Sequence, residues 1–410
     1  MKVLNINRFY YRRGGADVYF FTMSNILESK GHSVITFSTK SENNLSSPYS
    51  KYFVDGYSED TVSKLNFSKK ARIFINGIYS REVKRNLRKL IKENKPDIAH
   101  IHDIFYQLSL SVIDVLKEER IPMVMALNGY SVLCANGYLF RKGRICELCK
   151  DNRHRFLLFN RCFKGAFLPS LMAYLVKKLQ VRGKQLNYVD RFTVPHRDMK
   201  EFMSEWGIDD QKIDIISNPF NAAMYEPNYS FGDYIVAYGR VSRLKGIFTV
   251  LEAMKRQRTI KLKVFGSGPD YQKVANYIDK NKLDNIELDA KLRWGPDLIK
   301  IISKARFVIS APLWLSPSDY VISESFSLGK PVIASAIGGN NFLVKDGYNG
   351  FLFNPQDPVS LSEKIGLLYN DRNSIVEMGK NARKFVEEEF NYEKFYTNLM
   401  AIYKKALKPC

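Results

Sequence analysis

Short apolar runs alternate with longer amphipathic segments along almost the whole chain of 410 residues, and this alternation constrains the fold more than any other feature. In the first half the apolar runs occupy residues 1–6, 32–38, 97–102, 122–127, 191–195 and 212–217. In the second half they occupy residues 234–239, 261–266, 285–290, 306–310 and 330–335. Strands separated by helices indicate parallel sheets joined by right-handed crossovers. The two series predict an α/β protein with two Rossmann-like domains that face each other across a cleft.

Turn-rich sequence separates the two series. SNPFN at 217–221 and PNYSFGD at 227–233 are the clearest breaks, and the length of the chain suits two domains. We therefore expect a first domain over 1–217 and a second over 218–390. The first domain contains an irregular, cysteine-bearing insertion at about 128–165.

Hydropathy predicts a protein without a membrane span. The apolar stretch 166–176 has eleven residues and is broken by Pro169, which is too short to cross a bilayer. The N-terminus carries no apolar segment of the kind found in secretory signals. These observations predict a cytoplasmic location.

The net charge is +21, and it is unevenly distributed. Residues 141–200 hold 15 Lys and Arg against 4 Asp and Glu, and residues 61–95 hold 11 against 2. A basic surface of this kind attracts nucleic acid, phosphorylated substrates or anionic membranes. The chain has no recognition-helix, RNP or zinc-finger pattern, so nucleic-acid binding is not expected.

Parallel sheets bind ligands beyond the carboxyl ends of their strands, and a basic loop occupies such a place after the run 234–238. In GRVSRLKG, Gly239 ends the run and Arg240 and Lys245 flank a tight loop before the next helix. Two cations beside a helix N-terminus suit a diphosphate, although a solvated basic loop would have the same composition.

Glycines follow two other apolar runs. Gly266 in GSGP would let a ligand approach the backbone closely. Gly14 and Gly15 follow the first run and would expose amides to an anion bound in the other domain.

Taken in order, GGAD, GRVSRLKG, VFGSGP and ESFSLGKPVIASAIGG followed by DGYNGFLF resemble family-4 glycosyltransferases with the GT-B fold, of the type that builds bacterial surface polysaccharides. The resemblance covers nearly the whole chain. It implies transfer of a sugar from a UDP- or GDP-sugar to a glycan acceptor, with retention of configuration and no catalytic metal. It also implies that residues 391–410 form a last helix that crosses back onto the first domain.

The resemblance assigns roles in donor binding. Arg240 and Lys245 would neutralise the pyrophosphate and stabilise the departing nucleoside diphosphate. Gly14 and Gly15 would donate backbone hydrogen bonds to the same phosphates, and the backbone around Arg293 would border the base. Glu324 would accept hydrogen bonds from the ribose. A carboxylate in an apolar run needs a partner, although a purely structural carboxylate is the alternative.

Two residues depart from the family pattern. Ser316 occupies the place of a glutamate that touches the donor sugar, and Asn128 occupies the place of a histidine near the reacting carbon. Asp319 could supply a displaced carboxylate or cap the following helix, and the cap is slightly favoured. His100 and His102 either line the acceptor side or pack in the interior. A donor-binding but inactive accessory subunit is therefore the alternative to an active enzyme.

Four of the five cysteines fall in or beside the insertion. In a cytoplasmic chain, a CxxC pair with flanking cysteines resembles a structural zinc site more than a disulfide framework, although plain reduced thiols fit the pattern equally well. The expected ligands are Cys134, Cys146, Cys149 and Cys162.

Residues 152–188 interleave Arg and Lys with Phe, Leu and Tyr. Such helices lie in membrane interfaces, or pack on a core with a solvated basic side. Because the resemblance places acceptor binding in the basic first half, we expect peripheral association with the anionic inner face of the cell membrane.

Overall fold

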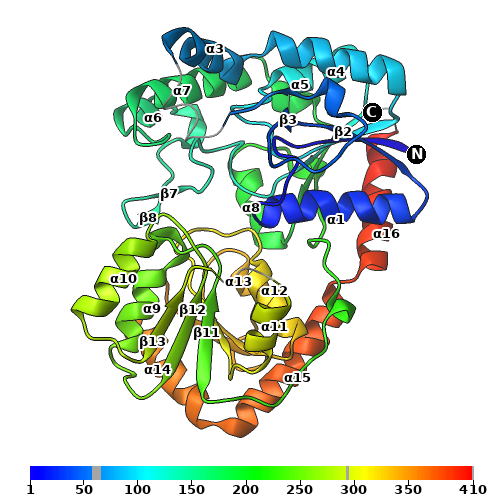
Figure 1. The fold of residues 1–410 in the computed structure, drawn as a ribbon. Helices are drawn as coiled ribbons and strands as arrows, with labels where there is room; N and C mark the ends of the chain where they lie inside the picture. Colours follow the sequence, from blue (N-terminus) through cyan, green and yellow to red (C-terminus); the bar gives the residue numbers. More distant parts are fainter. Residues whose placement is uncertain (58–65, 292–294, 409–410) are drawn as a thin grey trace. The chain divides into compact units, whose positions relative to one another are not determined.

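A computed structural model describes residues 1–57, 66–291 and 295–408. The chain folds as two units (Figure 1). Unit 1 consists of Met1–Leu139, Cys146–Pro219 and Tyr392–Cys410. Unit 2 consists of Phe140–Ile145 and Phe220–Asn391.

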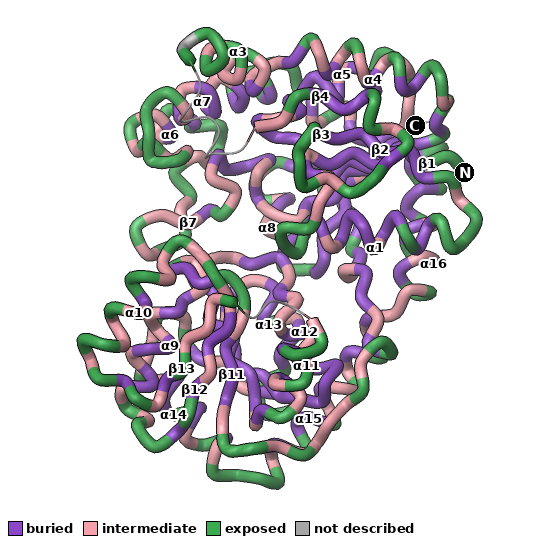
Figure 2. The backbone as a smooth tube through the Cα atoms, in the orientation of Figure 1, coloured by how far each residue is buried: buried purple, intermediate pink, exposed green. Residues whose placement is uncertain are grey.

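Unit 1 is built on a sheet of six parallel strands in the order β10-β9-β6-β5-β1-β2. The strands are β1 (Lys2–Ile6), β2 (Ser33–Phe37), β5 (Ile98–Ile101), β6 (Met123–Ala126), β9 (Arg191–Val194) and β10 (Ile213–Ile215). Most of their residues are buried (Figure 2), which explains why they read as continuous apolar runs. A short parallel pair is formed by β3 (Thr39–Lys40) and β4 (Val54–Asp55).

Helices surround this sheet. They are α1 (Gly15–Ser29), α3 (Phe67–Ile78), α4 (Arg81–Asn94), α5 (Ser111–Glu118), α6 (Arg155–Phe159), α7 (Phe167–Arg182), α8 (Arg197–Glu205) and α16 (Tyr392–Ala406). The last helix, α16, contributes Phe395, Leu399 and Tyr403 to the same core as Val3 and Tyr19. The C-terminal helix is therefore an integral part of unit 1.

The basic region around 66–95 forms two helices rather than one. Tyr79 has an extended backbone (φ −154°), which ends α3. The Ser80 hydroxyl accepts a hydrogen bond from the Val83 amide and caps α4. The two basic segments are therefore separate helices joined at Tyr79 and Ser80.

Unit 2 repeats the architecture with six parallel strands in the order β13-β12-β11-β14-β15-β16. They are β11 (Tyr234–Tyr238), β12 (Lys261–Phe265), β13 (Ile286–Asp289), β14 (Val308–Ser310), β15 (Val332–Ser335) and β16 (Gly350–Phe353). The hairpin strands β7 (Phe140–Arg141) and β8 (Arg144–Ile145) also belong to this unit. Two parallel sheets flanked by helices confirm the predicted two-domain α/β class.

The helices of unit 2 pack on both faces of its sheet and form two apolar clusters. They are α9 (Ile247–Met254), α10 (Tyr271–Lys280), α11 (Pro296–Ser303), α12 (Tyr320–Ser327), α13 (Asn340–Leu343), α14 (Pro358–Asn370) and α15 (Arg372–Glu389). Across the described parts of both units, every helix is too short or too polar to cross a bilayer.

Candidate functional site

The carboxyl edge of the unit 2 sheet brings together the loops that follow β11, β12 and β14. Two glycines allow these loops to touch through their backbones. Gly246 has φ +69°, and a Cβ there would lie 1.8 Å from the carbonyl oxygen of Ala311. Gly266 has φ +138°, and its Cβ would lie 1.9 Å from the carbonyl oxygen of Gly239. Only glycine fits at either position, so the predicted phosphate-binding loops form one continuous rim.

Lys245 and Asp319 form an ion pair on this rim. Lys245 Nζ lies 3.2 Å from Asp319 Oδ2, which also accepts a hydrogen bond of 2.8 Å from the hydroxyl of Ser310. The Asp319 side chain is 6% exposed and that of Lys245 is 33% exposed. A buried carboxylate therefore holds a half-buried ammonium group at the edge of the sheet. Asp319 directly precedes α12 but makes no side-chain capping hydrogen bond, so the capping role favoured from the sequence is wrong.

Glu324 lies one turn further along, on α12. The hydroxyl of Tyr238 donates a hydrogen bond of 3.1 Å to Glu324 Oε2. Burial raises the pKa of Glu324 to about 8; the Tyr238 hydrogen bond opposes this shift and the charge of Asp319 adds to it. The carboxyl group is thus largely protonated at neutral pH until a ligand supplies further hydrogen-bond donors.

Arg240 and Gly239 are exposed next to this pair. Within the described ranges, no carboxylate forms an ion pair with Arg240. The rim thus combines an unpaired guanidinium, an ammonium group and a protonated carboxyl group within one loop system. Such a set can bind a diphosphate and a vicinal diol side by side.

Ser316 is buried in the loop that follows β14. Its carbonyl oxygen accepts a hydrogen bond of 2.7 Å from the amide of Gly339, which ties this loop to the glycine turn after β15. The hydroxyl of Ser316 cannot replace the charge of a glutamate, and Pro317 has no amide hydrogen. Asp319 is the carboxylate of this loop that the structure brings against Lys245.

In unit 1, Gly14 and Gly15 are exposed at the N-terminus of α1, beyond the carboxyl end of β1. Buried Asp17 fixes this turn by accepting hydrogen bonds from Asn7 Nδ2 (3.1 Å) and the amide of Arg13 (3.2 Å). The N-terminus of a fifteen-residue helix is therefore open to solvent, as an anion site requires.

Asn128 follows β6 and is partly buried. Its Nδ2 atom is buried and makes no hydrogen bond to any residue that the structure describes. The predicted place of Asn128 near the reacting carbon stays a prediction.

His100 and His102 are buried in the core of unit 1. His100 Nδ1 lies 2.9 Å from the hydroxyl of Tyr403 on α16, and His102 Nε2 lies 2.7 Å from Asn5 Oδ1. Burial lowers the pKa of His100 to about 3, so the ring stays neutral. This geometry favours the packing role that the sequence left open. Arg293, the predicted neighbour of the base, lies outside the described residues.

The cysteine insertion is held by a buried lysine that sequence reasoning did not single out. Lys177 on α7 donates hydrogen bonds to the carbonyl oxygens of Ser131 (2.5 Å) and Val132 (2.7 Å). Its pKa falls to about 7 because of burial, which two nearby thiols partly oppose. Lys177 therefore fixes part of the cysteine-bearing insertion.

The thiols of the insertion are close enough to affect one another's ionisation. Burial raises the pKa of Cys149 to about 12, and the other three thiols add to this shift. Wherever the structure describes side chains, no three Cys, His, Asp or Glu groups converge as a metal ion would need. The zinc site with ligands Cys134, Cys146, Cys149 and Cys162 stays a prediction.

Two residues of the unit 2 rim were missed by the sequence analysis. Tyr238 is the last residue of β11, and Ser310 is the last residue of β14. A polar residue at the end of a buried strand was a usable signal, because such residues lie at the ligand-binding edge of a parallel sheet.

Family models match both parts of the chain. A model described as Glycosyltransferase Family 4 matches residues 13–223, which is more than half of the chain. The chain belongs to glycosyltransferase family 4. A second model, Glycosyl transferases group 1, matches residues 228–385 and so covers most of unit 2. The protein is thus a glycosyltransferase with the GT-B fold, as the sequence motifs predicted.

Relatives and solved structures agree with this family. An uncharacterized glycosyltransferase of Methanocaldococcus jannaschii is 24% identical over 78% of this chain and 86% of its own length. The N-acetyl-alpha-D-glucosaminyl L-malate synthase of Bacillus anthracis is 21% identical over 96% of this chain and 95% of its own.

Among solved structures, sucrose-phosphate synthase from Thermosynechococcus elongatus has a TM-score of 0.73 and 18% identity, with 98% of each chain covered. Anabaena HepE in complex with UDP-glucose has a TM-score of 0.66 and 14% identity, covering 98% of this chain and 100% of that one. At these identities the likeness shows the shared fold.

Proposed function

We propose that this glycosyltransferase moves a sugar from a nucleotide diphosphate sugar to a hydroxyl group of a glycan acceptor. The observation that supports the proposal is the rim of unit 2, where Lys245 pairs with Asp319, Glu324 accepts a hydrogen bond from Tyr238, and Arg240 is exposed. The UDP-glucose complex of Anabaena HepE, which shares the fold, supports a nucleotide-sugar donor.

The two cations, Arg240 and Lys245, would stabilise the departing nucleoside diphosphate. The bond between the sugar and the diphosphate breaks with negative charge building on the phosphate oxygens. Preorganised cations lower the free energy of that more highly charged state more than that of the bound substrate, whose diphosphate carries less negative charge. Lys245 is already oriented by Asp319, so little reorganisation is needed when the donor binds. Gly14 and Gly15 would add backbone donors to the same phosphates.

Glu324 would bind the ribose of the nucleoside. A ribose diol donates two hydrogen bonds, and an ionised carboxylate is the acceptor that such a diol prefers. Gly266 would let the nucleotide lie close to the backbone. Transfer with retention, with Asn128 near the reacting carbon, completes the proposal.

The acceptor is proposed to be a glycan, free or carried on a membrane lipid, during synthesis of a bacterial polysaccharide, lipopolysaccharide or capsule. Its carrier would lie at the anionic inner face of the membrane, and the net charge of +21 supports peripheral binding there. A catalytic metal is not part of the proposal, because protein cations act on the diphosphate.

The test has two stages. Calorimetry with UDP and GDP identifies the nucleotide, and a panel of its sugars is then assayed for hydrolysis and transfer. Lys245→Ala and Glu324→Ala should each lower turnover at least tenfold, whereas Lys280→Ala on the outer surface of α10 should not. Binding of nucleotide with no release of sugar from any donor would support the accessory-subunit alternative instead.

A further inference from the structure

The hydroxyl group of Tyr238 lies among more hydrogen-bond acceptors than its single proton can serve. Tyr238 is the last residue of β11. Its oxygen lies 3.1 Å from Glu324 Oε2, 3.0 Å from the carbonyl oxygen of Val321 and 3.4 Å from the hydroxyl of Ser325. A tyrosine hydroxyl donates one hydrogen bond and also accepts. The acceptor that takes the Tyr238 proton can therefore depend on whether Glu324 is ionised.

Two hydrogen-bond arrangements fit these distances. When Glu324 is protonated, its carboxyl group donates to the Tyr238 oxygen, and Tyr238 donates to the carbonyl of Val321. When Glu324 is ionised, Tyr238 donates to Glu324 Oε2 instead. The same two oxygen atoms stay in contact in both arrangements. The carboxyl group therefore keeps its direction when it loses its proton.

Ser325 allows this exchange without leaving an acceptor unpaired. Its hydroxyl donates a hydrogen bond of 2.6 Å to the carbonyl oxygen of Val321, and Ser325 is buried. The carbonyl of Val321 therefore keeps a donor after the Tyr238 proton turns to Glu324. A buried acceptor that lost its only donor would oppose the exchange.

Tyr238 is also the side chain with the largest influence on the ionisation of Glu324. Burial raises the pKa of Glu324 to about 8, and the hydrogen bond from Tyr238 is the main factor that lowers it. Within the described ranges, the other titratable groups that act on Glu324 are Asp319, ahead of α12, and Lys245, ahead of α9. Asp319 raises the pKa and Lys245 lowers it, and since the two form an ion pair, their effects on Glu324 partly cancel.

We propose that Tyr238 is a positioning residue for nucleotide binding, which holds the Glu324 carboxyl group in the direction of the ribose diol both before and after that group ionises. The proposal rests on the proposed function, in which Glu324 binds the ribose. A diol that donates two hydrogen bonds favours the ionised carboxylate. Binding should therefore release the proton of Glu324 to the buffer and turn the Tyr238 proton toward Glu324. Tyr238 needs no contact with the nucleotide for this role.

The test is calorimetric titration of the full chain with UDP and with GDP at pH 7, 8 and 9, comparing the wild type with Tyr238→Phe. Phenylalanine cannot donate to Glu324, so the pH at which affinity levels off should move above 8. If the lost hydrogen bond changes the ionisation equilibrium about tenfold, Tyr238→Phe should bind about tenfold more weakly than the wild type at pH 7 and only about twofold more weakly at pH 9. A purely structural role would weaken binding equally at both pH values.

A second variant and a matched control accompany this substitution. Ser325→Ala leaves Tyr238 as the side chain that donates to Val321, so the pH profile should move in the same direction by a smaller amount. Tyr234→Phe is the control, because Tyr234 is the first residue of the same strand and donates a hydrogen bond of 2.8 Å to the carbonyl oxygen of Ile301. It should keep the wild-type pH profile.

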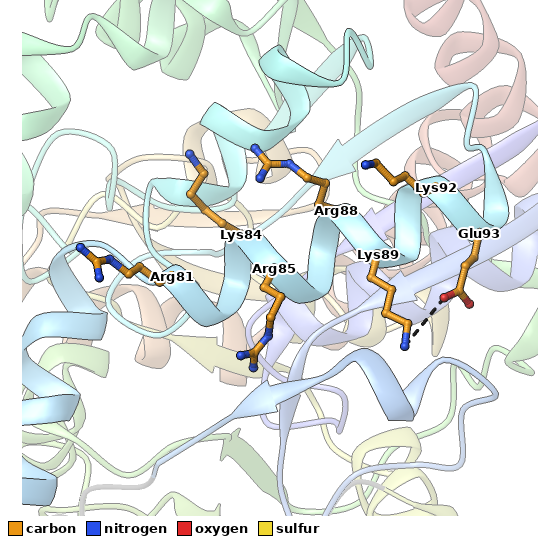
Figure 3. Close-up of a pocket in the computed structure, with 7 residues that line it drawn as sticks. All are labelled: Arg81, Lys84, Arg85, Arg88, Lys89, Lys92 and Glu93. Carbon is orange, nitrogen blue, oxygen red and sulfur yellow. Dashed lines mark ion pairs between the residues drawn. The ribbon is translucent and has the colours of Figure 1, made fainter.

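Nucleotide bound at another basic surface has to be distinguished from binding at this site. The outer side of α4 in unit 1 lines an open hollow of about 540 Å³ (Figure 3). In the described parts of the chain, no carboxylate forms an ion pair with Arg81 or Arg85 of this hollow. Arginine stays charged from pH 7 to pH 9, so binding there would not follow the ionisation of Glu324. The double variant Arg81→Gln, Arg85→Gln should keep the wild-type affinity and pH profile.

Two results would overturn the proposal: a Tyr238→Phe profile that levels off at the wild-type pH, or a loss of affinity that is equal at pH 7 and pH 9. Glu324→Gln tests the proposed function separately. If it leaves nucleotide affinity at pH 9 unchanged, Glu324 does not bind the ribose and both proposals fail. If it weakens binding while Tyr238→Phe keeps the wild-type profile, only the role of Tyr238 fails.

Discussion

The state of Glu324 makes nucleotide binding depend on pH in a defined direction. The free carboxyl has a pKa of about 8 because of burial, so roughly one tenth of it is ionised at pH 7 and roughly nine tenths at pH 9. If the ribose diol binds the ionised form, the complex lowers this pKa and binding releases a proton. Affinity must then rise with pH and level off above the pKa of the free group.

The expected gain in nucleotide affinity follows from these two ionised fractions of Glu324. The population of the competent, ionised form grows about tenfold between pH 7 and pH 9, which corresponds to about 1.4 kcal/mol of binding free energy. This pH range suits the measurement, because the second ionisation of a phosphate group has its midpoint near pH 6 and is about nine tenths complete at pH 7. Tyr238 does not titrate in it either, since burial holds its pKa well above the ordinary value.

The assay is calorimetry with the tighter-binding nucleoside diphosphate at pH 7, 8 and 9, in pairs of buffers that differ in ionisation enthalpy. The wild type should gain about tenfold in affinity and release close to one proton at pH 7. Glu324→Gln cannot ionise and should lose both effects, whereas Glu363→Gln, exposed on α14, should keep them. A constant affinity in the wild type, or a tenfold gain that survives in Glu324→Gln, would refute the reasoning.

Three further outcomes are expected. Asp319→Asn removes a negative charge that raises the pKa of Glu324, so the pH at which nucleotide affinity levels off should move below 8 in the same titration. An unchanged pH profile would contradict the influence of the Asp319 charge on Glu324. Tyr403→Phe removes the hydroxyl group that pairs with His100 in the core of unit 1. The free energy of unfolding in urea should fall by about 1–3 kcal/mol, and a change under about 0.5 kcal/mol would count against this hydrogen bond. The cysteine pattern predicts about one zinc ion per purified chain by elemental analysis, and less than about a third of an equivalent would count against it.

Strand positions could be predicted from the sequence because parallel strands are buried on both faces. Leu4 in β1 and Val236 in β11 have no exposed surface, and such strands read as unbroken apolar runs. The strand β16 escaped this test. It begins with Gly350, and only Phe351, Leu352 and Phe353 follow as a short apolar run, which was not assigned as a strand.

Arg240, Lys245 and Glu324 could be singled out from the sequence because they stand in local motifs, and their roles in donor binding stay predictions. The residues that contact them could not be predicted, since those contacts join parts of the chain that only the fold brings together. Tyr238 is 86 residues from Glu324 along the chain. For His100 the sequence left a place on the acceptor side and a packed interior place equally open. Its contact with Tyr403 on α16, 303 residues away, arises from the fold and favours the packed place.

The glycine contacts of the unit 2 rim bear on how such enzymes diverge. At Gly246 and Gly266 the spacing of the loops is set by backbone touching backbone, without any side chain between them. Substitutions elsewhere on the rim can therefore accumulate without moving the loops apart. A lineage could exchange side chains such as Ser316 and Asp319, which are predicted to lie near the donor sugar, and keep the same frame. Selection for a new donor would then act on a few side chains.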